Sequence, residues 1–287
     1  MIAVTGATGH LGKLILEHAL ARTPAGGVAA TCRDPSKAAG LAARGVQVRR
    51  GDFADPDALS DAFAGVDRVL IVSPDKLGEE GLRLSRNAVA AARSAGVRRV
   101  LYTSQVGTHA GSPFADHVHV EQTLAEGGLP WTSLRNGFYV ESLLQLIGDG
   151  LTTGEIAVPE DGPVSWTARA DLAEANAIIL ADDGRYDGLT PPLTAGEAVT
   201  MKDVAEMASE LTGREIRLIR VSDAQWRDAR VAAGVPRPMA EMLASIFAAM
   251  RQGDFAAVDP AMEGLLGRKP TSVRDVLSDH LARPEPH

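Results

Sequence analysis

The stretch that most constrains the fold lies at the amino terminus, where residues 5–12 read TGATGHLG. Four β-prone residues precede it and a run of helical spacing follows it. The first glycine permits a tight turn, the second lets the backbone approach a pyrophosphate, and the third lets the next helix pack on the sheet. The pattern predicts a dinucleotide-binding turn. The residues expected to contact the cofactor there are Gly6, Thr8, Gly9, His10, Leu11 and Gly12.

Short apolar runs alternate with helical patterns through the first half of the chain. The strand-like runs are IAVT, VAATC, VQVRR, RVLIVS and RVLYTS. Alternation of this kind predicts a parallel sheet covered by helices on both faces. The expected fold class is therefore α/β, with a doubly wound parallel sheet.

The second half of the chain is less regular. A strand is expected near residues 128–137, a short helix over 142–150, and an extended stretch leading into a helix over 165–181. Thr200 is expected to cap a helix over 200–213, with Asp203 in the capping-box position. A strand over 215–222 and helices over 236–253 and from Ser272 complete the pattern.

The end of the second strand predicts which dinucleotide is bound. An acidic side chain there would hold a ribose 2′-hydroxyl, whereas a basic one would accept a 2′-phosphate. The sequence CRDPSKA places Arg33 at the tip and Lys37 one helical turn later. Asp34 precedes Pro35 and is expected to cap the next helix rather than face a phosphate. The sequence favours NADPH over NADH.

Three further strand ends are expected to line the same pocket. Parallel strands present their carboxyl ends at one edge, where ligands of doubly wound sheets bind. Asp52 and Phe53 are expected to contact the adenine, and Ser73 and Pro74 to lie beneath the nicotinamide ribose. Thr103 and Ser104 are expected to bond the ribose or to cap their own strand.

Several stretches together carry a resemblance to a known family. TGATGHLG, CRDPSKA, GDFAD, RRVLYTS, LRNGFYVES and GRKPTS are similar to motifs of the NmrA-like atypical short-chain dehydrogenases, and most of all to bacterial NAD(P)H:quinone oxidoreductases. The resemblance spans nearly the whole chain. It implies a Rossmann-type sheet over residues 1–150, completed by a later strand near 186–196, and a smaller mixed α/β C-terminal domain over 151–287. It also implies NADPH binding.

The catalytic pair of typical short-chain dehydrogenases is missing. Those enzymes use Tyr-x-x-x-Lys, in which the Tyr protonates a carbonyl oxygen. The matching positions here are Val118 and Gln122, and neither can do this chemistry. Relatives in the NmrA-like group also lack the Tyr, but several keep the Lys, so Gln122 departs from them as well.

Two residues remain as catalytic candidates, and two more as acceptor contacts. His117 falls where relatives carry a histidine near the nicotinamide, and could orient or protonate an acceptor oxygen; the alternative is a helix-entry histidine facing water. Asn136 could donate to a carbonyl. Phe138 and Tyr139 could wall the acceptor site, although Phe138 fits a core position equally well. His117 and His119 form an H-x-H pair without a third ligand nearby, so no metal is expected.

These residues lead to one preferred function and two alternatives. Hydride addition to a quinone gives a delocalised anion that water can protonate, so aligning the reactants suffices without an acid. The preferred function is an NADPH-dependent reductase of quinones or similar conjugated carbonyl acceptors. The alternatives are a non-catalytic NADP(H)-binding redox sensor that acts on a protein partner, and a biosynthetic reductase of a polycyclic aromatic ketone.

Composition excludes several other classes. A net charge of −8 and 4% aromatic residues argue against a nucleic-acid partner. One cysteine among 287 residues rules out an intrachain disulfide and fits a reducing compartment. Without an apolar run long enough for a bilayer or a signal peptide, we expect no membrane partner and a cytoplasmic location. The sequence leaves open whether the protein forms a homodimer.

Overall fold

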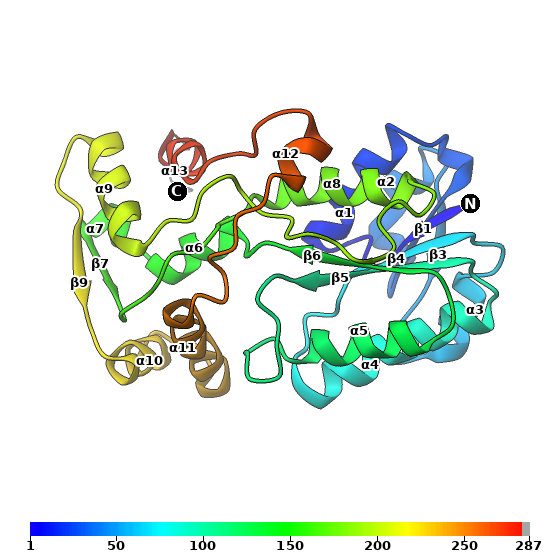
Figure 1. The fold of residues 1–287 in the computed structure, drawn as a ribbon, viewed down its shortest axis with the longest axis horizontal. Coiled ribbons are helices and arrows are strands. Elements are labelled where there is room, and N and C mark those ends of the chain that lie inside the picture. Colours follow the sequence, from blue (N-terminus) through cyan, green and yellow to red (C-terminus); the bar gives the residue numbers. More distant parts are fainter. Residues whose placement is uncertain (283–287) are drawn as a thin grey trace. The chain divides into compact units, whose positions relative to one another are not determined.

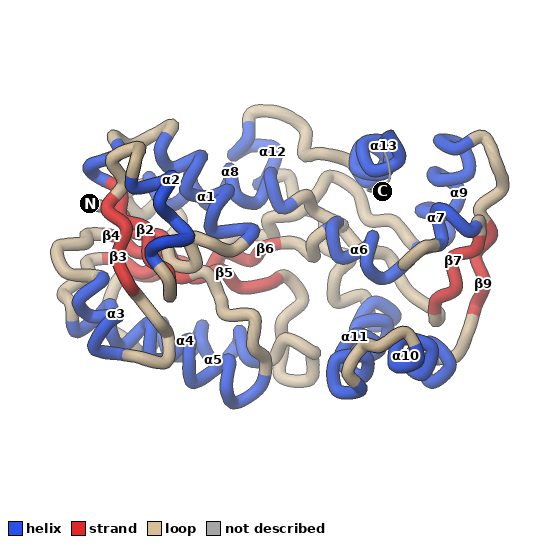
Figure 2. Tube along the Cα trace, turned by 180° about the vertical axis from the view of Figure 1, so that it is seen from behind, coloured by secondary structure: helices blue, strands red, loops and turns tan. Residues whose placement is uncertain are grey.

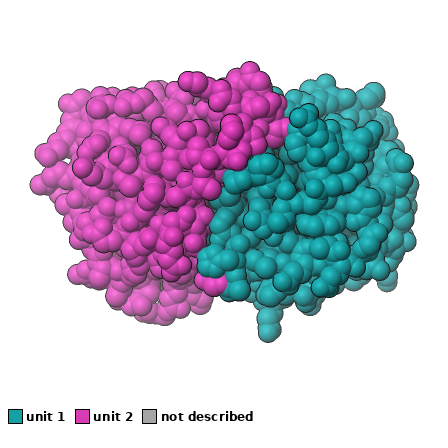
Figure 3. All heavy atoms as spheres, viewed as in Figure 1, with its two compact units in different colours: residues 1–110, 114–136, 170–193 teal, residues 111–113, 137–169, 194–287 magenta. Residues whose placement is uncertain are grey.

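The protein is described by a computed structural model over residues 1–282, and it forms two compact units (Figure 3). The first comprises residues 1–110, 114–136 and 170–193. The second comprises residues 111–113 and 137–169 and, of the described chain, residues 194–282. Neither unit is a single continuous segment.

The first unit is built on a seven-stranded parallel sheet. Its strands are β1 (Ile2–Val4), β2 (Val28–Cys32), β3 (Gln47–Arg50), β4 (Arg68–Ile71), β5 (Arg99–Gln105), β6 (Trp131–Asn136) and β8 (Gly188–Leu189). They lie in the order β3-β2-β1-β4-β5-β6-β8. This is the strand order of a Rossmann fold extended by one strand, as the sequence predicts.

Helices cover both faces of this sheet (Figures 1 and 2). One face carries α1 (His10–Leu20), α2 (Ala39–Ala42) and α8 (Arg169–Ala181). The other face carries α3 (Pro56–Ala62), α4 (Gly78–Ser94) and α5 (Asp116–Glu126). Short 3₁₀ turns, η1 (Ala25–Gly27) and η2 (Pro35–Ala38), flank β2. Because both faces are covered, the central strands read as continuous apolar runs.

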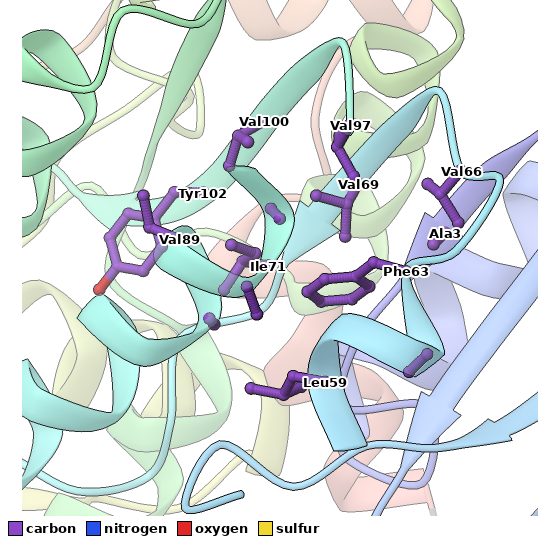
Figure 4. Packing of buried hydrophobic residues seen from close by; sticks show 14 of the residues in the cluster. Ala3, Leu59, Phe63, Val66, Val69, Ile71, Val89, Val97, Val100 and Tyr102 are labelled. Atoms are coloured by element: carbon purple, nitrogen blue, oxygen red, sulfur yellow. The ribbon is translucent and has the colours of Figure 1, made fainter. Parts of the chain in front are cut away.

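A hydrophobic cluster fills the space between the sheet and α3, α4 and α5 (Figure 4). Phe63, Val69, Ile71 and Val100 are almost fully buried in it. The ring of Tyr102 belongs to the same cluster, and its hydroxyl oxygen points away from Phe63 (Figure 4). The cluster therefore fixes the position of a polar group at its border.

Two arginines at the amino edge of the sheet hold the end of α8. The Arg68 guanidinium donates to the carbonyls of Leu180, Ala181 and Asp182, at 3.2, 2.7 and 2.8 Å. A cation is favourable at a helix C-terminus, where the last carbonyls lack partners. Arg99 forms an ion pair with Asp187 at 3.1 Å. The segment that ends in β8 is thus tied to β4 and β5 by charge.

The second unit pairs a small sheet with helices. Parallel strands β7 (Glu155–Val158) and β9 (Arg217–Arg220) form the sheet. The helices are α6 (Val140–Ile147), α7 (Gly150–Thr153), α9 (Met201–Thr212), α10 (Asp223–Ala232), α11 (Arg237–Gln252), α12 (Ala261–Leu266) and α13 (Val273–Ala282). Thr200 and Asp203 form the expected capping box of α9. No helix within residues 1–282 is both long enough and apolar enough to cross a bilayer.

The structure departs from the sequence-based expectations in three places. Residues 137–150 belong to the second unit, so the division differs from the expected boundary at residue 150. The helix expected after Pro35 is reduced to η2 and the four-residue α2, and the chain turns at Gly45, whose φ is +84°. β7, α7, α10 and α12 are additional elements; a capping box of Ser222 and Gln225 starts α10.

The fold predicts opposite outcomes for two helical glycines. A Cβ on Gly12 would lie 2.3 Å from the carbonyl oxygen of Gly6, whereas a Cβ on Gly40 would meet nothing within 4 Å. We expect Gly12→Ala to lower the free energy of unfolding by at least about 1–3 kcal/mol. Gly40→Ala should leave it unchanged or raise it by up to about 1 kcal/mol. Urea unfolding of both variants measures this, and equal stabilities would contradict it.

Candidate active site

The carboxyl ends of the parallel strands meet at one edge of the first unit. The strand order reverses between β1 and β4, and ligands of doubly wound sheets bind at such a reversal. The structure therefore brings the ends of β1 to β6 to one side, as the sequence predicts. Phe138 and Tyr139 belong to the second unit.

The glycine turn leaves a helix N-terminus ready for an anion. Gly6 adopts a φ of +64°, which favours glycine, and Gly9 is the N-cap of α1. No side chain caps this helix, and its first turn carries no acidic residue. Thr8, Gly9 and His10 are exposed, whereas Leu11 and Gly12 are buried. Unpartnered N–H groups and the helix dipole together suit a pyrophosphate.

The turn is fixed to the two neighbouring strands by hydrogen bonds. The Thr5 hydroxyl accepts from the N–H of Val72 at 2.8 Å, after β4. The N–H of Ala7 donates to the carbonyl of Thr31 in β2 at 3.1 Å. These bonds hold the turn in place before a ligand binds.

The loop after β2 presents two free cations. Arg33 and Lys37 are exposed and form no ion pair with any residue among 1–282. The Asp34 carboxylate accepts from Ser36 Oγ at 2.6 Å and from Ser36 N at 3.1 Å, so it caps η2 as expected. Those bonds, with a smaller contribution from Lys37, hold the pKa of Asp34 below its usual range. Two exposed cations at the end of β2 have the charge that a 2′-phosphate requires.

The end of β3 is partly engaged by the protein itself. Asp52 accepts from the N–H of Ala54 at 3.0 Å, which forms the turn. The Phe53 carbonyl accepts from the Asn87 side chain at 2.9 Å, and the Phe53 ring packs on the hydrophobic cluster. Both residues follow the end of β3.

Thr103 and Ser73 join the ends of β4 and β5. The Thr103 hydroxyl accepts from the N–H of Ser73 at 2.8 Å and donates to the Ser73 hydroxyl at 3.1 Å. Thr103 is buried, while Ser73 and Pro74 are partly exposed. We therefore expect Thr103 to support the site and Ser73 and Pro74 to face the ligand.

A buried carboxylate on α5 organises the neighbouring strands. Glu121 accepts from Ser104 Oγ at 2.8 Å, from Ser133 Oγ at 2.7 Å and from Arg135 Nη2 at 2.8 Å. Each of these hydrogen bonds is accepted by the charged carboxylate, so each is stronger than a hydrogen bond between neutral groups. Ser104 is thereby committed to the protein. Sequence analysis missed Glu121 because none of its partners is close to it in sequence.

His117 contacts a second residue that sequence analysis missed. Its Nδ1 lies 2.9 Å from the Tyr102 hydroxyl. Burial lowers the pKa of His117 to about 4, opposed by the nearby Glu121 carboxylate. The imidazole is therefore neutral at pH 7. His117 is therefore not a histidine that simply faces water, and at pH 7 it has no imidazolium proton to give to an acceptor.

Asn136 ends β6 with both polar atoms of its side chain buried and unpartnered. Gln105 lies opposite it at the end of β5, and its side-chain N–H₂ is also buried without a partner. Buried polar groups normally find a partner, so these two adjacent amides are candidates for contact with a ligand or a bound water. Gln105 was not expected from the sequence. Only its register with Asn136 reveals it.

Phe138 and Tyr139 have different surroundings in the second unit. The Phe138 ring stacks on Phe255 at 4.8 Å and lies 5.3 Å from Trp166, with 7% of the residue exposed. Tyr139 is partly exposed, and the Arg169 guanidinium lies 4.9 Å from its ring centre. Burial raises the pKa of Tyr139 to about 12. Phe138 thus has the surroundings of a core residue.

His119 does not share the surroundings of His117. It is exposed, and its Nδ1 lies 3.4 Å from the side-chain oxygen of Gln122. Across residues 1–282, no group of three or more His, Cys, Asp and Glu side chains is arranged to hold a metal ion.

The chain matches the model of the NmrA-like family over residues 1–273. It belongs to the NmrA-like family.

Relatives of this NmrA-like protein include named oxidoreductases. It is 33% identical to quinone oxidoreductase 2 of Escherichia coli over 97% of its own length and 98% of that protein. The crystal structure of the NADPH-dependent quinone oxidoreductase from Escherichia coli, complexed with NADPH, is similar at a TM-score of 0.92 and 32% identity, covering 98% and 100% of the two chains. Triphenylmethane reductase of Citrobacter, complexed with NADP(H), is similar at 0.91 and 32% identity, covering 97% and 99%.

The turn geometry predicts a binding defect without unfolding. Gly9 has φ −83° and ψ 165°, which valine adopts readily, and a Cβ would meet only the Gly6 carbonyl oxygen at 3.2 Å. We expect Gly9→Val to fold but to lose dinucleotide binding, because its side chain occupies the space of the pyrophosphate. Circular dichroism and NADPH titration measure both properties, with Gly40→Ala as the control. Undiminished NADPH affinity in folded Gly9→Val would contradict the assignment of this turn.

Proposed function

We propose that this protein transfers hydride from NADPH to a quinone or a similar conjugated carbonyl acceptor. Its broader class, an NAD(P)H-dependent oxidoreductase with a small-molecule acceptor, follows from its family relatives. The observation that carries the proposal is the carboxyl edge of the sheet. An uncapped helix, two free cations and two unpartnered amides gather there.

NADPH is the cofactor, and it supplies the hydride when bound. The α1 N-terminus would hold its pyrophosphate through backbone N–H groups. Arg33 would pair with the 2′-phosphate in a bidentate fork, and Lys37 would add a second charge. Asp52, Phe53, Ser73 and Pro74 would border the adenine and ribose positions.

The acceptor side needs orientation more than acid catalysis. A quinone that receives hydride becomes a delocalised hydroquinone anion, and solvent water supplies the proton. Asn136 would donate its free side-chain N–H₂ to an acceptor carbonyl, with Gln105 beside it. His117 would donate a hydrogen bond to the oxygen on which charge develops. Tyr139, partly exposed, is a better candidate for acceptor contact than the buried Phe138.

Cofactor preference should depend on Arg33. A hydrogen bond to a charged group contributes about 1.5–3 kcal/mol, or roughly 10- to 150-fold in affinity. We expect Arg33→Ala to weaken NADPH by that factor and to leave NADH nearly unchanged, as measured by fluorescence titration. Arg44→Ala is a matched control, because Arg44 precedes β3 at the opposite edge of the sheet and pairs with Glu17. An equal loss for both cofactors would show that Arg33 supports structure instead.

Turnover of a simple benzoquinone with NADPH tests the two catalytic candidates. A neutral hydrogen bond contributes about 0.5–1.5 kcal/mol, so His117→Ala should lower kcat about tenfold or less. Asn136→Leu should raise KM for the quinone by roughly 5- to 150-fold, because the acceptor carbonyl loses its donor.

Other outcomes of this assay support other functions. A kcat loss near 10⁴ for His117→Ala would identify a true general acid and favour reduction of an isolated aromatic ketone. Tight NADPH binding without turnover of any quinone would favour a redox sensor. Arg44→Ala again serves as the control for unspecific loss.

A further inference from the structure

Tyr102 combines a core position with a hydrogen bond to the acceptor-side histidine. The residue is 1% exposed, and its ring packs in the hydrophobic cluster between the sheet and the helices α4 and α5 (Figure 4). Its hydroxyl is the one polar atom of that side chain, and it lies 2.9 Å from His117 Nδ1. A buried tyrosine hydroxyl needs a partner, and a rigid ring fixes where that partner must be.

We infer that Tyr102 is a positioning residue: its hydroxyl donates to Nδ1 of His117 and holds the neutral imidazole with its single proton on Nε2, ready to donate to the acceptor oxygen. This inference rests on the proposed function, because that function assigns His117 to the acceptor. Tyr102 stands within the motif RRVLYTS, but neither its role nor the identity of the protonated nitrogen follows from that motif.

The direction of the hydrogen bond follows from the groups around the phenol. The Tyr102 hydroxyl lies 2.9 Å from His117 Nδ1, and the residues 1–282 offer it no other hydrogen bond. Burial is the main cause that raises the pKa of Tyr102, with Asp116 and Glu121 acting in the same direction and Ser85 opposing them. A buried phenol that keeps its proton must donate it to the partner it has. The phenol therefore keeps its proton, and Nδ1 is its acceptor.

The imidazole has one proton left to place. It is neutral at pH 7 because burial lowers the pKa of His117 to about 4, despite the opposing Glu121 carboxylate. A neutral imidazole that accepts at Nδ1 carries its proton at Nε2. Nε2 bonds to no residue among 1–282. It is the end of the Tyr102–His117 pair that is left to meet a ligand.

The hydrogen bond from Tyr102 to His117 suits an acceptor that becomes a stable anion. The Nε2–H group stabilises developing charge without giving up its proton, so no imidazolate forms. Without the Tyr102 hydroxyl, the ring could protonate at either nitrogen and could rotate. Tyr102 would thus improve catalysis without touching the acceptor.

The experiment measures the tautomer first. In protein labelled with ¹⁵N-histidine, the His117 signals are assigned by their loss in His117→Ala. We expect protonation at Nε2 alone, with the Nδ1 shift of a hydrogen-bonded acceptor. Tyr102→Phe keeps the ring in the core, and we expect its Nδ1 shift to lose the hydrogen-bond signature. A wild-type ring protonated at Nδ1 would overturn the inference, whatever the enzyme reduces.

Kinetics supply a second, independent readout. We expect Tyr102→Phe to lower kcat for benzoquinone by no more than His117→Ala does, with an unchanged KM for NADPH. The double variant should be no slower than His117→Ala alone, because both changes remove the same donor. Tyr186→Phe, at a partly exposed tyrosine beside Arg185, is the matched control. Additive losses would overturn the inference. Absence of quinone turnover would refute only the proposed function, and the tautomer would still decide this one.

Discussion

The close approach of α1 to the turn after β1 is the contact on which the site depends. A side chain as small as alanine at residue 12 would bring its Cβ within 2.3 Å of the Gly6 carbonyl oxygen. Only this approach lets α1 start directly at the edge of the sheet, where its free N–H groups become a phosphate site. The bonds of Thr5 and Ala7 then secure the same turn to β4 and β2. The glycines of this turn thus serve two purposes: they let α1 pack closely on the turn, and they keep space open for a ligand.

Most of the fold could be predicted because its signals are local. A strand, a glycine turn and a helix follow one another in the sequence, and Asp34 before Pro35 marks a cap that the structure confirms. The β7 strand was not predicted, and its pairing partner β9 lies far along the chain, with Glu155 opposite Arg217. The position of β8 in the sheet depends on arginines more than 80 residues away in sequence, which no local pattern reveals.

The site was predictable only where a backbone turn or a strand end creates it. The arrangement of Glu121, Ser104, Ser133 and Arg135 brings together two strands and a helix, so spacing along the chain gives no sign of it. In the motif alignment, Glu121 stands one residue before Gln122, the position of the missing lysine. In place of the usual catalytic pair, α5 carries two residues with other contacts. Glu121 binds side chains of two strands, and His117 lies beside Tyr102 of the hydrophobic cluster.

The hydrogen bonds and ion pair by which Arg68 and Arg99 hold residues 180–187 limit how the protein can be divided into fragments. A fragment cut after residue 150 would contain six of the seven strands of the sheet but would expose the outer edge of β6. It would also leave two guanidinium groups without the carbonyls and carboxylates that they bind. Expression of the cofactor-binding half alone therefore requires grafting residues 170–193 back onto it through a designed linker.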